Sequence, residues 1–387
     1  MDEKDFIVFG APDIQQAEID EVVDSLKSGW IGTGPKVARF ENDFACYKDV
    51  SPDRVTAVNS GTAALHLALL AAGIGPGDEV ITTAMTFCAT VNAIIHSGAT
   101  PVLADIKLAT GNIDPNDIEH RITSRTRAIL PVHYAGQPCN MSAIMDIAKK
   151  HNLIVVEDCA HAIEAEYRGQ KCGTIGDFGC FSFYVTKNIT TAEGGMVISK
   201  KTEHANKIKT LSLHGMSHDA WRRFSDNGYK HYFVAEAGFK YNMTDLQAAL
   251  GIHQLARIEK NHSVREGVYQ YYLSNLENLP IHLPYTENAD CIRHAYHLFP
   301  IRLQQNMHMN RDTLLDRLNQ AGIGVGVHYL SIPTHPYYTD RFSWTEDDYP
   351  SSSRFGKNTL SIPLSPALTH SDMAYIVEKL NILLSCD

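Results

Sequence analysis

The sequence predicts an α/β protein in which a mostly parallel sheet, flanked by helices, is followed by a smaller C-terminal α+β domain. Its 387 residues, 44% of them hydrophobic, suffice for one large and one smaller domain. Between about residues 55 and 200, short apolar runs alternate with helical patterns, which is typical of βα units. After about residue 245 the pattern changes to long helices.

In the first part, each predicted strand is a short apolar run and each predicted helix is a stretch of good helix formers. The predicted strands are 79–83, 100–106, 128–132, 154–157, 180–184 and 196–199, and the predicted helices are 63–72, 89–96 and 142–151. The stretch 14–26 also has apolar residues at helical spacing, and Ser28-Gly29 is a plausible helix end. The stretch 214–239 is the least predictable.

The second part begins with two predicted helices, 245–260 and 263–276. A strand at 295–303 and helices starting at Arg311 and Ser371 follow. We therefore expect a large domain with an N-terminal arm at 1–250 and a small domain at 251–387.

Composition argues against several classes of function. The formal net charge of -10, without a block of Lys or Arg, makes nucleic acid an unexpected partner. No apolar run approaches the roughly 18 residues of a membrane span, and the acidic start, Met-Asp-Glu-Lys-Asp, is unlike a signal peptide. The eight cysteines form no Cys-x-x-Cys pair. We expect reduced thiols and a cytoplasmic protein without a membrane partner.

The stretch 59–65, Asn-Ser-Gly-Thr-Ala-Ala-Leu, joins a strand-like run to a helix. Free amides at a helix N-terminus attract anions, the Thr62 hydroxyl would add a donor, and Gly61 would let a phosphate come close. The same pattern is common as a simple helix cap. Taken alone, it leaves phosphate binding and capping open.

Asp158 ends a predicted buried strand, Ile154-Val155-Val156-Glu157. Open parallel sheets bind ligands at the carboxyl ends of their strands, and a buried carboxylate needs a partner there. A protonated pyridine nitrogen would be such a partner. An Asp that only caps the following turn is an equally good interpretation in isolation.

Lys187 follows the apolar run 180–185 and precedes a turn rich in Thr and Gly. Apolar surroundings lower the pKa of a lysine and make its amine nucleophilic toward an aldehyde. Most lysines are solvated surface groups, but an apolar run such as 180–185 rarely precedes a surface lysine.

With these three elements in this order, the chain resembles the DegT/DnrJ/EryC1/StrS sugar aminotransferases. These are fold-type I enzymes of the aspartate aminotransferase superfamily that use pyridoxal 5′-phosphate (PLP). The resemblance covers nearly the whole length, and the matching stretches are 29–35, 60–69, 75–80, 157–161, the Lys187 segment, 238–245 and 326–329. It implies a mostly parallel, seven-stranded sheet.

The resemblance also implies roles for individual residues. Lys187 would be the catalytic lysine that forms a Schiff base with PLP, and Asp158 would pair with the pyridine nitrogen. The other residues implied to bind the cofactor are Phe87, stacked on the ring, His161, beside its phenolic oxygen, and Gly61, Thr62 and Ser182, at the phosphate. A residue of the segment containing Asn242 would reach the phosphate of a neighbouring subunit, so a homodimer with shared active sites is expected. Without the resemblance, core packing is the favoured interpretation of Phe87, whereas a buried, hydrogen-bonded core histidine and a site residue are equally good interpretations of His161.

The Gly29–Gly34 segment lacks the spacing and the preceding strand of a dinucleotide-binding motif. The resemblance instead makes it a substrate-binding loop that includes Gly32 and Thr33. It likewise places His328 and Tyr329 near the sugar or its diphosphate.

Two departures from the family pattern are visible. Ala192 stands where relatives often have glycine, and Ile163-Glu164 replaces a turn that usually contains glycine. Neither departure removes a catalytic group. No metal site is predicted, because the 19 histidines form no metal-binding motif.

The resemblance implies transfer of the amino group of L-glutamate to a nucleotide-linked keto sugar, leaving 2-oxoglutarate. The segments 322–329, 335–338 and 360–366 resemble the branch that aminates carbon 4. We therefore expect a UDP-linked 4-keto-6-deoxy hexose and a 4-amino sugar for surface polysaccharide or glycan biosynthesis. The alternatives are a 3-keto substrate and a non-catalytic PLP-fold regulator; a 3-dehydratase would carry histidine in place of Lys187.

Overall fold

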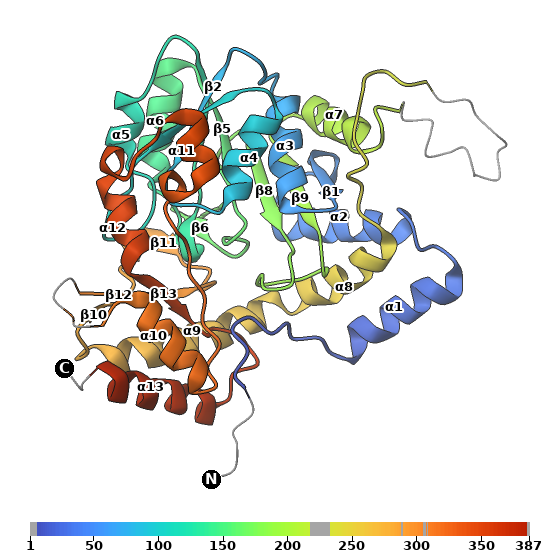
Figure 1. Ribbon diagram of the computed structural model, residues 1–387. Helices are drawn as coiled ribbons and strands as arrows, with labels where there is room; N and C mark the ends of the chain where they lie inside the picture. The colour runs from blue at the N-terminus through green and yellow to red at the C-terminus, as the bar shows by residue number, and fades with distance from the viewer. Residues whose placement is uncertain (1–5, 217–232, 288, 305–306, 308, 385–387) are drawn as a thin grey trace.

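The computed structural model describes residues 6–216, 233–287, 289–304, 307 and 309–384 (Figure 1). The helices are α1 (Gln16–Ser28), α2 (Pro35–Tyr47), α3 (Gly61–Ala71), α4 (Cys88–His96), α5 (Pro115–His120), α6 (Met141–His151), α7 (Thr202–Ser212), α8 (Asp245–Ala256), α9 (Ile258–Leu276), α10 (Arg311–Gln320), α11 (Pro336–Phe342), α12 (Pro350–Asn358) and α13 (His370–Leu384). The strands are β1 (Val55–Val58), β2 (Glu79–Thr83), β3 (Thr100–Ala104), β4 (Thr126–Leu130), β5 (Ile154–Asp158), β6 (Glu166–Tyr167), β7 (Gln170–Lys171), β8 (Phe178–Ser182), β9 (Gly195–Ser199), β10 (Ile281–His282), β11 (Ile292–Arg293), β12 (Phe299–Leu303) and β13 (Thr359–Ile362).

The largest sheet has seven strands in the order β1-β9-β8-β5-β4-β2-β3. The strands β3, β2, β4, β5 and β8 run parallel, whereas β9 is antiparallel to both β8 and β1. The buried strands read as nearly continuous apolar runs because helices cover such a sheet. The predicted α/β fold with a mostly parallel, seven-stranded sheet is confirmed.

Element boundaries differ from the prediction in two instructive places. The strand predicted at 295–303 begins at Phe299, because the backbone amides of Ala295 and His297 donate to the 135–136 loop instead of to a neighbouring strand. The helix predicted at 245–260 ends at Ala256, and α9 starts two residues later, beyond the non-helical Arg257.

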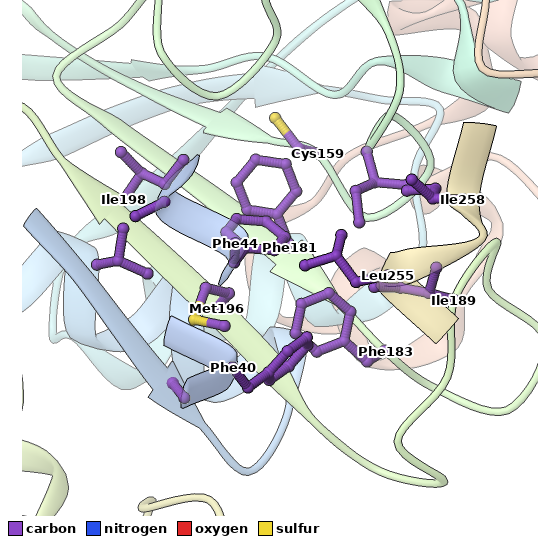
Figure 2. Close-up of a cluster of buried hydrophobic side chains, with 14 of the residues drawn as sticks. Phe40, Phe44, Cys159, Phe181, Phe183, Ile189, Met196, Ile198, Leu255 and Ile258 are labelled. Carbon is purple, nitrogen blue, oxygen red and sulfur yellow. The ribbon is translucent and has the colours of Figure 1, made fainter. Parts of the chain in front are cut away.

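The aromatic core behind β8 fixes the segment that leads to Lys187 (Figure 2). Phe181 and Phe183 point into this core, where the Phe181 ring centroid lies 5.1 Å from that of Phe44 and the Phe183 centroid 5.3 Å from that of Phe40. Side chains alternate along a strand, so Ser182 points to the opposite side. Ile189, just after Lys187, is buried in the same cluster.

The C-terminal part has its own three-stranded sheet, β10-β12-β13, with α9, α10 and α13 packed around one apolar cluster. Two contacts join segments far apart in the sequence across the C-terminal part and the region of the large sheet. Ile7 pairs with Ile323, and Tyr338 of α11 packs with Ala84 and Val91 of the large-sheet region. The domain limits 1–250 and 251–387 stay a prediction.

The seven described cysteines are free thiols, and Cys386 lies outside the described residues. In the part of the chain that the structure describes, no helix combines the length and apolar character needed to cross a bilayer.

Candidate active site

A cavity of about 550 Å³ opens at the carboxyl ends of the parallel strands β2, β4, β5 and β8, where ligands bind in sheets of this kind. Its lining brings together nine of the residues predicted from the sequence, namely Gly61, Thr62, Phe87, Asp158, His161, Ser182, Lys187, His328 and Tyr329. Gly32, Thr33 and Asn242 do not line it.

The N-terminus of α3 forms one end of the cavity. Ser60 is the N-cap and accepts a hydrogen bond from the Ala63 amide at 3.1 Å. The amides of Gly61 and Thr62 belong to the first turn, whose amides have no partner within a helix. A Cβ atom on Gly61 would lie 2.8 Å from the Cβ of Ser182. A side chain at position 61 would therefore collide with Ser182, and glycine allows α3 to begin close beside β8.

Asp158 lies at the end of β5 and is buried. One carboxylate oxygen accepts from the Thr90 hydroxyl at 2.9 Å and the other from the Ala160 amide at 3.1 Å. Burial raises the pKa of this carboxyl, and the hydrogen bonds from Ala160 and Thr90 and the charge of Lys187 oppose that shift. A cationic partner from a ligand would therefore be bound strongly here.

Lys187 approaches the cavity from the turn after β8. Its backbone amide donates to the Tyr184 carbonyl at 2.8 Å. Burial lowers the pKa of the Lys187 amine to about 8, although the carboxylate of Asp158 opposes that shift. An amine with such a pKa is partly neutral near pH 7, as a nucleophile and a proton carrier must be.

His161, Tyr329 and Phe87 form an aromatic wall. The Ala135 amide donates to His161 Nδ1 at 3.3 Å, so we assign the ring proton to Nε2, which lies 2.9 Å from the Tyr329 hydroxyl. Burial, and then the charge of Lys187, holds the pKa of His161 well below its usual value. His161 then donates to Tyr329, whose hydroxyl keeps its own proton for another acceptor.

Phe87 is not a core residue. Its side chain is 57% exposed, and its ring centroid lies 5.9 Å from that of Tyr329 at the edge of the cavity. A large exposed ring beside a cavity provides a surface for a planar ligand.

His328 is held by the C-terminal region. Its Nδ1 lies 3.0 Å from the Ser361 hydroxyl, and its ring stacks on Phe9 with centroids 5.3 Å apart. Burial and the charge of Lys187 lower its pKa to about 3, so the ring is neutral. His328 can therefore offer a hydrogen bond but not a charge.

The three residues outside the cavity form a cluster of their own. Asn242 donates to the Thr33 hydroxyl at 2.6 Å, and that hydroxyl donates to the Met243 carbonyl. The Gly32 carbonyl accepts from the Asp245 amide, and the Asp245 carboxylate caps α2 through the amides of residues 34, 36 and 37. The two predicted loops are therefore joined to each other, and none of these three residues lines the cavity of their own chain.

The sequence prediction missed Thr90, which supports Asp158, and Thr86, whose hydroxyl lies 2.7 Å from that of Thr90. A signal was available: Thr90 follows Phe87 by three residues at the start of a helix, and residues three apart share a helix face. Tyr184 and Glu193, which also line the cavity, carried no comparable pattern.

The described residues contain one group with the spacing of a metal site, formed by His133, Glu157 and Cys159. His133 Nδ1 accepts from the Cys139 amide, and Nε2 lies 3.0 Å from a Glu157 oxygen. Both ring nitrogens are therefore already engaged, and a metal ion would have to break these bonds.

Comparisons with known proteins identify the family of this chain. Residues 12–381 match the model of the DegT/DnrJ/EryC1/StrS aminotransferase family. The chain is 45% identical to the spore coat polysaccharide biosynthesis protein SpsC of Bacillus subtilis over 96% of each chain. The putative sugar aminotransferase Spr1654 from Streptococcus pneumoniae, in its PLP form, superposes with a TM-score of 0.91 at 34% identity, covering 98% of this chain and 99% of the other. Helicobacter pylori PseC, an aminotransferase involved in pseudoaminic acid biosynthesis, gives 0.90 at 28% identity over 99% and 100%.

The cavity contains a lysine of lowered pKa, a buried carboxylate and a helix N-terminus, which are groups that PLP chemistry requires, and the family match spans nearly the whole chain. This chain belongs to the DegT/DnrJ/EryC1/StrS aminotransferase family, fold-type I transaminases that depend on PLP.

Proposed function

We propose that this enzyme transfers the amino group of L-glutamate to carbon 4 of a UDP-linked 4-keto-6-deoxy hexose. The observation that carries the proposal is that Lys187, Asp158 and the N-terminus of α3 line one cavity of about 550 Å³. That volume lies within the range of sites for cofactors and small molecules.

Each part of the cofactor has a matching group. The amides of Gly61 and Thr62 and the Ser182 hydroxyl would bind the phosphate, because a helix N-terminus favours negative charge. The Asp158 carboxylate, held in place by the Thr90 hydroxyl, would accept a hydrogen bond from the protonated pyridine nitrogen and balance its charge. Phe87 would cover one face of the ring.

When bound, the cofactor supplies an aldehyde that captures the amino group and a ring that withdraws electrons from the reacting carbon. Lys187 would hold the aldehyde end of the cofactor, and its amine would carry a proton between the two reacting carbons. A pKa of about 8 suits an amine for both giving and taking that proton. Tyr329 would donate its hydroxyl proton to an oxygen of the ligand.

The sugar and its nucleotide are proposed from the sequence segments 322–329, 335–338 and 360–366 and from the relatives. His328 and Tyr329 belong to the first segment, and both line the cavity. SpsC is a spore coat polysaccharide biosynthesis protein, and PseC is an aminotransferase of pseudoaminic acid biosynthesis. We place the product, a 4-amino sugar, in surface polysaccharide or glycan biosynthesis, and the enzyme in the cytoplasm with its nucleotide-sugar substrate.

We further propose a homodimer with shared active sites. Thr33 and Asn242 meet each other outside the cavity of their own chain. Ile19, Val23 and Leu26 of α1 are 39–57% exposed, and a second copy would cover this apolar face. In such a dimer, Asn242 would reach the phosphate in the neighbouring subunit and the Gly32–Thr33 loop would contact its substrate.

The test is product analysis by NMR after incubation with L-glutamate and a panel of 4-keto and 3-keto sugars linked to UDP, dTDP and GDP. We expect amination at carbon 4 with a UDP sugar, and none with Lys187→Ala. Amination only at carbon 3 would contradict the proposed substrate but would be consistent with PLP-dependent amino transfer. A protein that binds PLP but transfers no amino group from glutamate would be a regulator.

A further inference from the structure

The position of Lys187 needs an explanation, because a lysine side chain is long and flexible. Its four-carbon stem loses rotamer entropy when it is held in one conformation. The backbone of the lysine must therefore be held firmly if its amine is to reach a reacting carbon accurately. One anchor is Ile189, which is buried in the aromatic core (Figure 2).

The second anchor is Asn188, the residue directly after the lysine. Its amide nitrogen donates to Glu164 Oε2 at 2.7 Å and to the Ala295 carbonyl at 2.9 Å. Its amide oxygen lies 2.8 Å from His297 Nδ1. These contacts join the Lys187 turn to the loop after β5 and to the segment before β12.

Glu164, one of the two departures from the family pattern, is fully buried. Its other carboxylate oxygen accepts from Arg265 of α9, which is 1% exposed. The Nε and Nη1 atoms of Arg265 have no partner among the described residues. Removing Glu164 would therefore leave a buried guanidinium without its counter-charge, which is strongly destabilising.

His297 continues the network toward the catalytic cavity. Its ring centroid lies 4.4 Å from that of His161, which contacts Tyr329. Burial and the charge of Lys187 hold the pKa of His297 well below its usual value, so the ring is neutral. Since it donates from Nδ1 to Asn188, the bond depends on the amide oxygen of that residue.

Lys187, Asn188, Arg265 and His297 also line a second, small cavity of about 30 Å³. The lysine turn is thus not packed tightly on that side, and the hydrogen bonds of Asn188 carry more of the positioning.

We infer that Asn188, held by Glu164 and His297, is a positioning residue that fixes Lys187 for proton transfer. The inference rests on the proposed function of Lys187. Asn188 does not line the cofactor cavity. It acts through the backbone of its neighbour.

The first variant is Asn188→Ala, with Asn112→Ala as its matched control. Asn112 is buried, whereas Asn188 is partly buried. The Asn112 side chain also makes three hydrogen bonds, to the carbonyls of Gln137 and Pro138 and from the Tyr134 amide, but it lies outside both cavities. Both variants should lose thermal stability. Only Asn188→Ala should shift the pH at which the visible absorbance of the Lys187-bound cofactor changes, by about one unit. It should also lower kcat about 10- to 100-fold, with little change in KM for glutamate.

The second variant is Asn188→Asp, which keeps an acceptor for His297 but faces Glu164 with a carboxylate. The new carboxylate at position 188 and that of Glu164 would repel each other, which raises the pKa of one of them. At lower pH a proton shared between them would therefore restore the hydrogen bond from residue 188 to Glu164. We expect the ratio of its kcat to that of Asn188→Ala, which has no carboxylate at this position, to rise as pH falls.

The outcomes separate this inference from the proposed function. If Asn188→Ala and Asn112→Ala differ only in stability, or if the Asn188→Asp ratio does not change with pH, the positioning role is wrong. Should Asn188→Ala fail to fold, the pH dependence of Asn188→Asp decides alone. If the wild type itself shows no Lys187-bound cofactor absorbance, the proposed function fails first.

Discussion

Two adjacent carboxylates at the end of β5, Glu157 and Asp158, lie on opposite sides of the strand and have opposite surroundings. Glu157 accepts four hydrogen bonds, from His133 Nε2 and from the amides of residues 173, 175 and 176. Asp158 accepts one from a hydroxyl and one from an amide, and it lines the cavity.

The pKa shifts of the two groups follow from these partners. Burial opposes ionisation of Glu157, but the hydrogen bonds from His133, Gly176 and Gly173 outweigh it and lower the pKa. At Asp158 burial is the larger effect and raises the pKa. A fully bonded carboxylate stabilises the fold, whereas one with unused acceptor capacity is available to a ligand.

The largest expected effect is that of Asp158→Asn on catalysis. The amide cannot balance a protonated ring nitrogen, so we expect kcat to fall about 10²- to 10³-fold. The raised pKa means that the ionised Asp158 costs stability above pH 3.8, the ordinary pKa of the group. The free energy of unfolding of the cofactor-free variant at pH 7 should therefore equal or exceed that of the wild type, as chemical denaturation would show. Near-normal turnover would mean that the ring lies elsewhere.

Glu157→Gln should lower the free energy of unfolding but leave kcat nearly unchanged, the reverse of the pattern expected for Asp158→Asn. Each oxygen of Glu157 accepts two N–H donors, so a glutamine places its own N–H₂ against donors in either orientation. We expect a loss of about 3 kcal/mol in the free energy of unfolding, with kcat close to the wild type for the folded fraction.

The pH dependence of stability gives a control for Glu157→Gln. The folded pKa of Glu157 lies below its unfolded value of 4.5, so its contribution is present above pH 4.5 and is lost as pH falls through the folded pKa. The stability difference between wild type and Glu157→Gln should narrow below pH 4.5. A constant difference, or a variant as stable as the wild type, would contradict the structural role.

The third prediction concerns Asn242, which does not line the cavity of its own chain. In a homodimer with shared sites, mixing inactive Lys187→Ala with Asn242→Ala should restore about a quarter of the wild-type activity after random subunit exchange. Each variant mixed with itself is the control. A mixture that stays inactive, with both variants folded and dimeric, would contradict the proposed reach of Asn242.

The sequence predicted the parts of the site that depend on local pattern. Lys187 and Asp158 each follow an apolar strand, and Gly61 opens a helix, so the topology brings them to one edge of the sheet. The role of Glu157 could not be predicted, because its partners come from two other loops. The contact between Thr33 and Asn242, 209 residues apart, and the bonds of Asn188 to Glu164 and His297 also depend on long-range packing. The helix α2 was not predicted, although Val37, Phe40 and Phe44 have helical spacing, because the preceding glycine-rich segment is typical of a loop.

The smallest expected effect is at Ala192, which stands where relatives often have glycine. Its φ of 64° lies in the left-handed region, which disfavours a Cβ atom. Ala192→Gly should raise the free energy of unfolding by about 0.5–1 kcal/mol after the entropy of the unfolded chain is included. The matched control, Ala143→Gly within α6, should lower it by about 1 kcal/mol. Destabilisation by Ala192→Gly would show that the Ala192 methyl group has a packing role.

Lys187 carries the central claim, and borohydride reduction tests it most directly. Purified enzyme loaded with PLP should absorb visible light, and reduction followed by peptide mass mapping should place the cofactor on Lys187. The variant Lys187→Ala should still bind PLP in the cavity but give no reduced adduct. A label on another lysine, such as the buried Lys48, or no label with PLP bound, would contradict the account.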